Sequence, residues 1–448
     1  MHLEHPCWAP EVRDAVNDLL DRFRDSGQYA VTDFDNTTSV FDIEHQLIIW
    51  QLRHMAFAME PDRLAEVLAK DLVCSYSDWI GDIVTAYRHL WDTYGPFNGD
   101  MLSEEESERI MQDVWWREFS VKMRAMFSLV NSTERMSSVW ILYWFTGMTE
   151  RQVYDLALSS HLHYSRVPTV SRSEDSPAEI PSALGVVTAR WTDGIRVTDS
   201  VVELWAALKD NGIGLWVCSA SGSMQVKAAI DAFGLHDLCT GLYAMNLLVD
   251  EQGRYVPEYD RANGAFHRPV EGGWETYPQT SGAIPRQDGK VQAILDGPFK
   301  VHGHGPVAGF MDSTGDFDFC TVFDSMRLVV CYNRLLAPSD GGALISCLAL
   351  YERDILGYGL ASAMEKGDTL CVLQGRDENG LRSLLPQNGT LLLGADGSRV
   401  FHEETQDMMA EMKELDSSVR ELIDRYGPVD GNGRGFLKEY RGYHSIMD

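Results

Sequence analysis

Two aspartates at the end of an apolar strand constrain this chain more than any other feature. The run Tyr29-Ala30-Val31-Thr32 is followed by Asp33-Phe34-Asp35 and a turn that begins at Asn36. Carboxylates two residues apart leave a strand on the same side. One of them can attack a phosphorus atom while the other handles the proton of the leaving group. Because Asp-x-Asp also occurs in ordinary turns and calcium loops, the pattern needs partners elsewhere in the chain.

Three further polar motifs stand where an apolar strand ends or a helix begins. In chain order they are Ser219-Ala220-Ser221, Gly289-Lys290 and Asp312-Ser313-Thr314-Gly315-Asp316. Strands and helices alternate around them, which predicts a parallel sheet with its ligand site beyond the carboxyl ends of the strands. The four motifs are therefore expected to converge at one edge of that sheet.

This order of motifs resembles the haloacid dehalogenase superfamily, and specifically its phosphatase branch. Dehalogenases of the superfamily lack the second aspartate of the first motif, so Asp35 favours phosphate chemistry. The segments Phe145-Thr146-Gly147-Met148-Thr149 and Gly289-Lys290 are similar to phosphorylcholine and phosphoserine phosphatases. The resemblance covers roughly residues 10–335. One departure is Met311 before Asp312, where the family usually has glycine, and it raises the question of space around a metal ion.

The resemblance implies a role for each residue of the first two motifs. Asp33 is the expected nucleophile and forms an aspartyl phosphate, while Asp35 is the general acid and then the base that activates water. Ser219 is expected to donate a hydrogen bond to a phosphoryl oxygen, together with the backbone N–H groups of Ala220 and Ser221. A helix N-cap is the alternative interpretation of Ser219.

The resemblance also points to a catalytic lysine. Lys290 is expected to offer its charge to the phosphate and to Asp33, and Lys300 is the weaker candidate because it follows the helix that Lys290 opens. His302 and His304 form a His-x-His pair that could bind a metal ion. Flanking glycines and Pro306 favour a surface loop instead.

A magnesium site is expected at the last motif. Asp312 would bind Mg²⁺ together with Asp33 and the backbone carbonyl of Asp35, and Asp316 would be a further ligand or hold a bound water. Hard oxygen ligands of this kind suit Mg²⁺.

Substrate specificity is expected to come from the segment that follows the first motif. Asp42 and Glu44 begin this segment, where the resembling phosphatases place a carboxylate near the ammonium group of the substrate. Aromatic faces beside carboxylates could hold a quaternary ammonium group. The segment holds several of the chain's 12 tryptophans, although packing within its own core explains most of them. The candidates are Trp50, Trp79, Trp91, Trp115, Trp116, Trp140 and Trp144.

The expected fold is α/β, with a Rossmann-like parallel-sheet core, a large helical cap inserted after the first core strand and a smaller insertion before Lys290. The 448 residues exceed a single hydrophobic core. The predicted division is core at 1–44, helical cap at 45–190, core at 191–249, flap-like insertion at 250–286, core and extension at 287–395, and helical tail at 396–448.

The charge, hydropathy and cysteine content of the chain limit the binding partners and the cellular compartment that can be expected. The formal charge of −29 argues against nucleic acid or an anionic membrane as a partner. The sequence contains no apolar run of about 18 residues, so no membrane span is expected. The eight cysteines form no Cys-x-x-Cys pair, and the first nine residues do not resemble a signal peptide. A reduced, cytoplasmic protein of unknown oligomeric state is expected.

Together these features predict a Mg²⁺-dependent phosphomonoesterase that acts through an aspartyl phosphate on a small phosphorylated metabolite. Phosphorylcholine or another phosphorylated amino-alcohol is the favoured substrate by resemblance. A phosphomutase with the same motifs is one alternative. A catalytically silent protein that binds phosphate ligands is another, although such a protein would have no need of Asp35.

Overall fold

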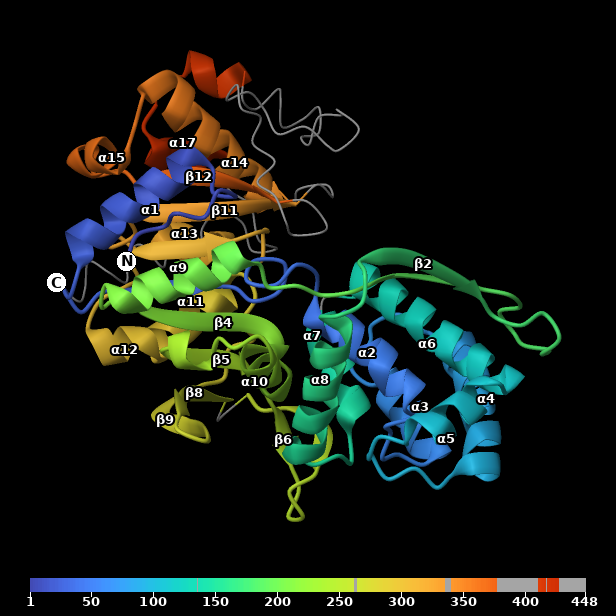
Figure 1. Ribbon diagram of the computed structural model, residues 1–448. Helices are drawn as coiled ribbons and strands as arrows, with labels where there is room; N and C mark the ends of the chain where they lie inside the picture. The colour runs from blue at the N-terminus through green and yellow to red at the C-terminus, as the bar shows by residue number, and fades with distance from the viewer. Residues whose placement is uncertain (135, 262–263, 335–339, 377–409, 416, 427–448) are drawn as a thin grey trace.

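The computed structural model describes residues 1–134, 136–261, 264–334, 340–376, 410–415 and 417–426. At its centre is a sheet of eight strands with helices on both faces (Figure 1). In spatial order the strands are β12 (Leu370–Arg376), β11 (Leu328–Arg334), β10 (Ala308–Met311), β1 (Tyr29–Thr32), β4 (Gly214–Gly222), β5 (Gly241–Met245), β8 (Gly264–Val270) and β9 (Gly273–Ser281).

The predicted α/β class is confirmed. Strands β12 to β5 run parallel, and β8 and β9 add an antiparallel edge beyond β5. β1 lies in the middle of the sheet between β10 and β4. Its carboxyl end therefore opens at the centre of the molecule, with the ends of two neighbouring strands beside it. The core is Rossmann-like, with a large helical insertion after β1 and a smaller insertion before Lys290, as predicted.

The short β1 strand is buried on both faces, as its apolar sequence requires. Ala30 packs into one hydrophobic cluster, and Tyr29 and Val31 pack into a second cluster on the other face. Successive side chains of a strand point to opposite faces, so a strand covered by helices on both sides reads as a continuous apolar run. The helices around the sheet are α1 (Pro10–Phe23), α9 (Asp199–Asp210), α10 (Ser223–Ala232), α11 (Asp288–Asp296), α12 (Pro298–His302), α13 (Phe317–Val322), α14 (Asp340–Tyr351), α15 (Leu360–Lys366) and α17 (Val419–Tyr426).

The cap, defined here as helices α2 to α8, lies to one side of the sheet (Figure 1). Its helices are α2 (Ile43–Arg53), α3 (Pro61–Ala69), α4 (Ser77–Tyr94), α5 (Glu104–Met111), α6 (Val114–Thr133), α7 (Ser137–Leu142) and α8 (Glu150–Tyr164). Capping boxes at Ser103 and Thr149 begin α5 and α8, with Glu106 and Gln152 three residues further on as this motif requires. A two-stranded arm of β2 (Val170–Asp175) and β3 (Thr188–Asp193) follows and runs along α6.

The insertion before Lys290 is rich in strands, and only part of it is separate from the central sheet as a flap would be. β8 and β9 extend the central sheet, because β8 pairs antiparallel with β5. β6 (Leu247–Val249) and β7 (Tyr255–Tyr259) form a separate hairpin. This β6–β7 hairpin reaches the cap.

Two sets of backbone contacts fix the cap to the core. The chain segments entering and leaving the cap meet where the Val40 N–H donates to the Arg196 carbonyl at 2.7 Å. On the other side, the Gly147 N–H donates to the Tyr255 carbonyl, and the Tyr255 N–H donates to the Met148 carbonyl, both at 2.8 Å. The cap is therefore joined to the core by its two linkers and also by the β6–β7 hairpin.

The predicted tail at 396–448 lies largely outside the described residues, as do positions 377–395 of the predicted extension. Within the tail, Val419, Leu422 and Ile423 of α17 are buried in the second hydrophobic cluster. The boundaries proposed for the core and cap segments stay predictions. Among the helices described, none combines the length and the apolar character needed to cross a membrane.

Candidate active site

A cavity of about 210 Å³ lies at the carboxyl ends of β1, β4 and β10, between the core and the cap. This is the edge of a parallel sheet at which ligands bind in α/β proteins. Its lining includes most of the residues that the sequence singled out, namely Asp33, Asp35, Asp42, Glu44, Ala220, Ser221, Lys290, Asp312 and Asp316. The structure thus brings together motifs that are up to 283 positions apart (Asp33 to Asp316).

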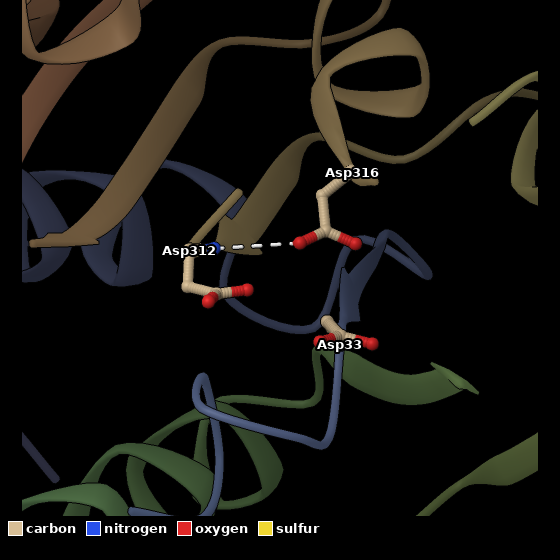
Figure 2. A group of neighbouring side chains, drawn as sticks. All are labelled: Asp33, Asp312 and Asp316. Carbon is tan, nitrogen blue, oxygen red and sulfur yellow. Dashed lines mark hydrogen bonds between the residues drawn. The ribbon is translucent and has the colours of Figure 1, made fainter. Parts of the chain in front are cut away.

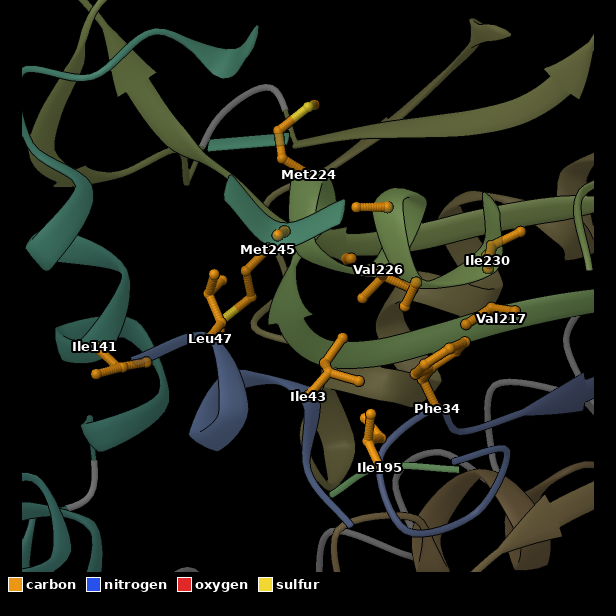
Figure 3. Packing of buried hydrophobic residues seen from close by; sticks show 14 of the residues in the cluster. Phe34, Ile43, Leu47, Ile141, Ile195, Val217, Met224, Val226, Ile230 and Met245 are labelled. Atoms are coloured by element: carbon orange, nitrogen blue, oxygen red, sulfur yellow. The ribbon is translucent and has the colours of Figure 1, made fainter. Parts of the chain in front are cut away.

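The first motif is anchored by the residue between its two aspartates. Phe34 is completely buried and packs in one cluster with Ile43, Ile195 and Val217, as Figure 3 shows. This packing fixes the backbone of the loop that follows β1. Asn36 then adopts a left-handed conformation, with φ of 60°, which turns the chain toward the cap.

Three buried carboxylates form a compact cluster at the strand ends. Ligand oxygens of Asp33, Asp312 and Asp316 all lie within 4.8 Å of one another (Figure 2). The Asp312 N–H donates to Oδ2 of Asp316 at 3.4 Å. Hard divalent cations are bound by carboxylate oxygens arranged in this way. The cluster could therefore hold a metal ion.

Lys290 is buried against the same cluster. Its Nζ donates to Oδ1 of Asp33 and to Oδ1 of Asp316, each at 2.5 Å. The preceding Gly289 is required by the close turn, because a Cβ atom there would lie 1.7 Å from the Ile284 carbonyl oxygen. The Gly-Lys pair thus places an amine between two carboxylates at the start of α11.

The electrostatics of the cluster favour a further cation. Burial and the neighbouring Asp316 raise the pKa of Asp33 well above its usual range, and the charge of Lys290 only partly opposes this. Burial alone would lower the pKa of Lys290, but Asp316 and Asp33 more than offset it, so the pKa is raised. Three carboxylates share one ammonium group here, and a divalent ion would compensate the remaining negative charge.

Asp35 is held as a hydrogen-bond acceptor at the cavity wall. Its Oδ1 accepts from the Ile43 N–H at 2.8 Å, and its Oδ2 accepts from the Ser221 hydroxyl at 2.7 Å. Burial, followed by the charge of Asp42, raises the pKa of Asp35 to about 7. A carboxyl group with such a pKa can give and take a proton near neutral pH.

The serine motif is arranged differently from the expectation. Ser219 is fully buried, does not line the cavity, and accepts a hydrogen bond from the Ser221 N–H at 3.1 Å. Its hydroxyl also lies 3.4 Å from Asp35. The N-cap interpretation is wrong, because α10 begins at Ser223 after Gly222. Ala220 and Ser221 line the cavity.

Asp42 and Glu44 lie where the first motif enters the cap. Asp42 is the N-cap of α2 and accepts from the backbone N–H groups of Glu44 and His45. The Gly222 N–H donates to Oε1 of Glu44 at 3.1 Å. Burial, then the charges of Asp42 and Asp35, raise the pKa of Glu44 well above its usual range.

The remaining lining comes from residues that sequence reasoning missed. They are polar or small apart from three, and comprise Asn36, His45, Phe127, Asn131, Ser137, Ser138, Ile141, Pro285, Arg286, Ser313 and Gly315. The ring of His45 packs edge-on against Phe127 at 4.7 Å between centroids. The positions of the residues on α6 and α7 depend on cap packing, which no short motif records. Asn36, Ser313 and Gly315 stand within or beside the motifs themselves. The nearness of His45 to Glu44 and of Arg286 to Lys290 is the signal that could have pointed to those two.

None of the seven tryptophans considered as binding surfaces for a quaternary ammonium group lines this cavity. Trp140 and Trp144 are buried in the cap and pack edge to face, with centroids 5.4 Å apart. These side chains therefore serve the core of the cap, as the alternative interpretation held.

Other candidates also fall outside the site. His302 stacks on Tyr29, which stands at the opposite end of β1 from Asp33, with ring centroids 4.5 Å apart. Lys300 is exposed and pairs with Asp296. Met311 is fully buried in the hydrophobic cluster beneath the site, and the three aspartates still converge beside it.

Comparison with known proteins bears on the fold. No family model matches the sequence, and no curated protein matches it. A crystal structure of a conserved protein of unknown function from Anaerococcus prevotii DSM 20548 is similar with a TM-score of 0.64 and 21% identity, over 84% of this chain and 94% of that chain. This likeness shows that the two proteins share a fold.

Two solved structures are similar at a much lower level. A protein of unknown function from Bordetella pertussis Tohama I has a TM-score of 0.35 and 13% identity, over 76% of this chain and 96% of that chain. Cytosolic 5′-nucleotidase IIIB bound to cytidine has a TM-score of 0.33 and 13% identity, over 84% of this chain and 90% of that chain. Neither likeness is close enough to support an argument about function.

Proposed function

We propose that this protein is a Mg²⁺-dependent phosphomonoesterase that forms an aspartyl phosphate on Asp33. The observation that carries the proposal is the buried cluster of Asp33, Asp312, Asp316 and Lys290 beside Asp35. A nucleophile, a charge-neutralising group and a titratable acid are what phosphoryl transfer requires. The order of the motifs, which resembles the haloacid dehalogenase phosphatases, supports the same chemistry.

The residues suggest a two-step reaction. Asp33 attacks phosphorus and forms a new P–O bond while the bond to the leaving alcohol breaks, and Asp35 gives its proton to the alcohol oxygen. Asp35 then takes a proton from water, whose oxygen attacks the phosphorus atom and releases phosphate from Asp33. Lys290 neutralises charge at Asp33 and at the phosphoryl oxygens throughout. A Mg²⁺ ion held by Asp33, Asp312, Asp316 and the Asp35 carbonyl would supply further charge neutralisation.

The substrate we propose is a small phosphorylated metabolite. The cavity of about 210 Å³ is smaller than pockets for drug-sized ligands, which span about 300–1,000 Å³. Asp42 and Glu44 support a cationic amino-alcohol such as phosphorylcholine or phosphoethanolamine as the leaving group. The support comes from these carboxylates and not from tryptophan, because among the described residues the aromatic side chains in the lining are His45 and Phe127.

The first experiment measures phosphate release with Mg²⁺ from phosphorylcholine, phosphoethanolamine, phosphoserine and sugar phosphates. We expect turnover of at least one ester by the native protein and none by Asp33→Asn, which keeps the shape of the side chain but removes the nucleophile. Ser313→Ala, at a lining residue with no role in the mechanism, is the matched control. A phosphomutase would transfer phosphate between positions without releasing it, and a silent binding protein would do neither. Full activity of Asp33→Asn would exclude the mechanism.

A second experiment tests the leaving group. Glu44→Gln should raise KM for phosphorylcholine or phosphoethanolamine by about tenfold, because one carboxylate and an aromatic face contribute about 1–3 kcal/mol to binding a cation. Turnover of a neutral aryl phosphate should barely change. If sugar phosphates are hydrolysed as well as phosphorylcholine, the amino-alcohol assignment is lost while the phosphatase chemistry stands.

A further inference from the structure

A second cavity, of about 600 Å³, lies where the cap, the core and the β8–β9 turn meet. Tyr154 of α8 lines it from the cap, Lys227 and Asp231 of α10 from the core, and Trp274 from β9. Helices α8 and α10 pack against each other at this junction (Figure 1). Among the residues that the structure describes, none lines both this cavity and the candidate active site. Its volume is typical of pockets that bind small organic molecules.

Lys227 is the unusual residue of this cavity. Its side chain is only 6% exposed. Within the described part of the chain, its amine makes no hydrogen bond and no ion pair. Burial lowers the pKa of Lys227 to about 8, and the charges of Glu150 and Asp231 only partly oppose this. A buried ammonium group without a partner is unfavourable, so a negatively charged ligand in the cavity would stabilise it.

The acidic side chains of the lining, Glu150 and Asp231, do not form an ion pair with Lys227. Oδ2 of Asp231 accepts hydrogen bonds from the Tyr154 hydroxyl at 2.6 Å and from the Trp274 indole N–H at 3.1 Å. Glu150 is exposed at the start of α8. The buried charge that faces the cavity is therefore the positive charge of Lys227. The same hydrogen bonds hold the rings of Tyr154 and Trp274 in the wall, where they offer flat apolar surface.

We propose that this cavity is an accessory binding site for a small organic anion with a flat apolar body. The anionic group would pair with Lys227, and the body would lie against Trp274 and Tyr154. Such a ligand would contact the cap through α8 and the core through α10 and β9, so it would stabilise the arrangement in which the two are packed together. The site is separate from the proposed phosphatase chemistry and does not depend on it.

Three probes separate the contributions of charge and ring. Indole-3-acetate carries both, acetate carries the charge without the ring, and indole-3-ethanol carries the ring without the charge. Titration calorimetry on the full chain should show that indole-3-acetate binds at least tenfold more tightly than either of the other two. It should also raise the melting temperature of the native protein.

Lys227→Gln should weaken the binding of indole-3-acetate at least tenfold and abolish its effect on the melting temperature. Lys300→Gln, at an exposed lysine on α12, is the matched control and should bind as the native protein does. Phosphate release without the probe should be unchanged in both variants, which shows that they are folded. Trp274→Leu keeps the charge and should weaken binding by removing the ring surface. Equal binding by Lys227→Gln and the native protein, or no binding of indole-3-acetate at all, would overturn the proposal.

Discussion

Asp35 is the residue whose surroundings most directly support acid–base chemistry. Two donors, the Ile43 N–H and the Ser221 hydroxyl, hold its carboxyl group in place. Asp35→Asn keeps an oxygen that can accept from the Ile43 N–H and an NH2 group that can donate to the Ser221 hydroxyl oxygen, but it cannot exchange a proton. We expect kcat to fall about 10²–10⁴-fold with little change in KM, because general acid–base catalysis typically contributes that much. Steady-state kinetics with rapid-quench detection of the aspartyl phosphate will check this, and an unchanged kcat would assign the proton transfer to another group.

The cluster of Asp33, Asp312 and Asp316 should make activity depend on a bound metal ion. Chelation should inactivate the protein and Mg²⁺ should restore activity, since three carboxylates share one ammonium group. Asp312→Ala should raise the Mg²⁺ concentration for half-maximal activity more than Asp316→Ala. The reason is that Asp316 already accepts hydrogen bonds from Lys290 and from the Asp312 N–H. Phosphate release is measured over a Mg²⁺ titration. Full activity in excess chelator, with no metal by elemental analysis, would contradict the prediction.

Much of the candidate site could be predicted at this scale, and the reason is local. Asp33, Asp35, Lys290, Asp312 and Asp316 each follow a strand or open a helix, so their convergence follows from the parallel sheet alone. The cap side of the cavity could not be predicted in this way. Residues such as Asn131 and Ser138 reach the cavity only through the packing of whole helices, which no short motif records.

At the scale of elements, the β6–β7 hairpin gives the cap a backbone attachment to the core in addition to its two linkers. It pairs with the cap at Gly147, whose φ of 84° is unfavourable for other residues. A Cβ atom there would lie 2.7 Å from the Ala58 carbonyl oxygen. Gly147→Ala should therefore lower the free energy of unfolding by about 2–4 kcal/mol, from backbone strain and overlap together. It should also make the cap more sensitive to limited proteolysis.

Gly253, in the turn of the same hairpin, is the matched control. Its φ is 73°, but a Cβ atom would meet nothing within 4 Å. Gly253→Ala should lower the free energy of unfolding by only about 1–2 kcal/mol, because the left-handed backbone is the only source of strain there. Denaturant unfolding of the two variants measures both values. Equal losses would mean that the close approach of Gly147 to the Ala58 carbonyl adds nothing to the cost of the substitution.

The elements themselves were predictable to different degrees. Capping boxes at Ser103 and Thr149 act within one turn, so their sequence spacing is enough to place α5 and α8. The pairing of β8 with β5 was not predicted, because it joins segments separated by a hairpin and follows from no local pattern. Composition showed only that the 250–286 stretch suits strands and turns.

At the scale of the whole molecule, the burial of His161 and His267 connects stability to pH. His161 of α8 is fully buried and its Nε2 donates to the Gln225 carbonyl in α10 at 3.2 Å, so it lies at the cap–core junction. Burial lowers the pKa of His161 to about 4. His267 of β8 is also buried, and burial followed by the charge of Lys227 lowers its pKa to about 3. Both side chains are neutral in the folded protein at neutral pH.

Protonation of these two histidines favours the unfolded chain over the folded protein. Between pH 6.5 and the lowered pKa, the unfolded chain holds a proton on each histidine that the folded protein does not, so stability falls as pH falls through this window. Each histidine should account for a loss of about 2 kcal/mol by pH 5. His161→Gln, which keeps a donor for the Gln225 carbonyl, should remove that share of the pH dependence. Denaturant unfolding at pH 7.5 and pH 5 gives the difference directly.

The comparison between variants is needed because buried acids act in the opposite direction. Burial raises the pKa values of Asp33 and Glu44, so these groups favour the folded protein as pH falls. Ser160→Ala, next to His161 and equally buried, is the matched control, because it changes packing at the same junction without removing a titratable group. It should shift stability by the same amount at both pH values. If His161→Gln also shifts stability equally at the two pH values, His161 is not the group that connects the cap–core junction to pH.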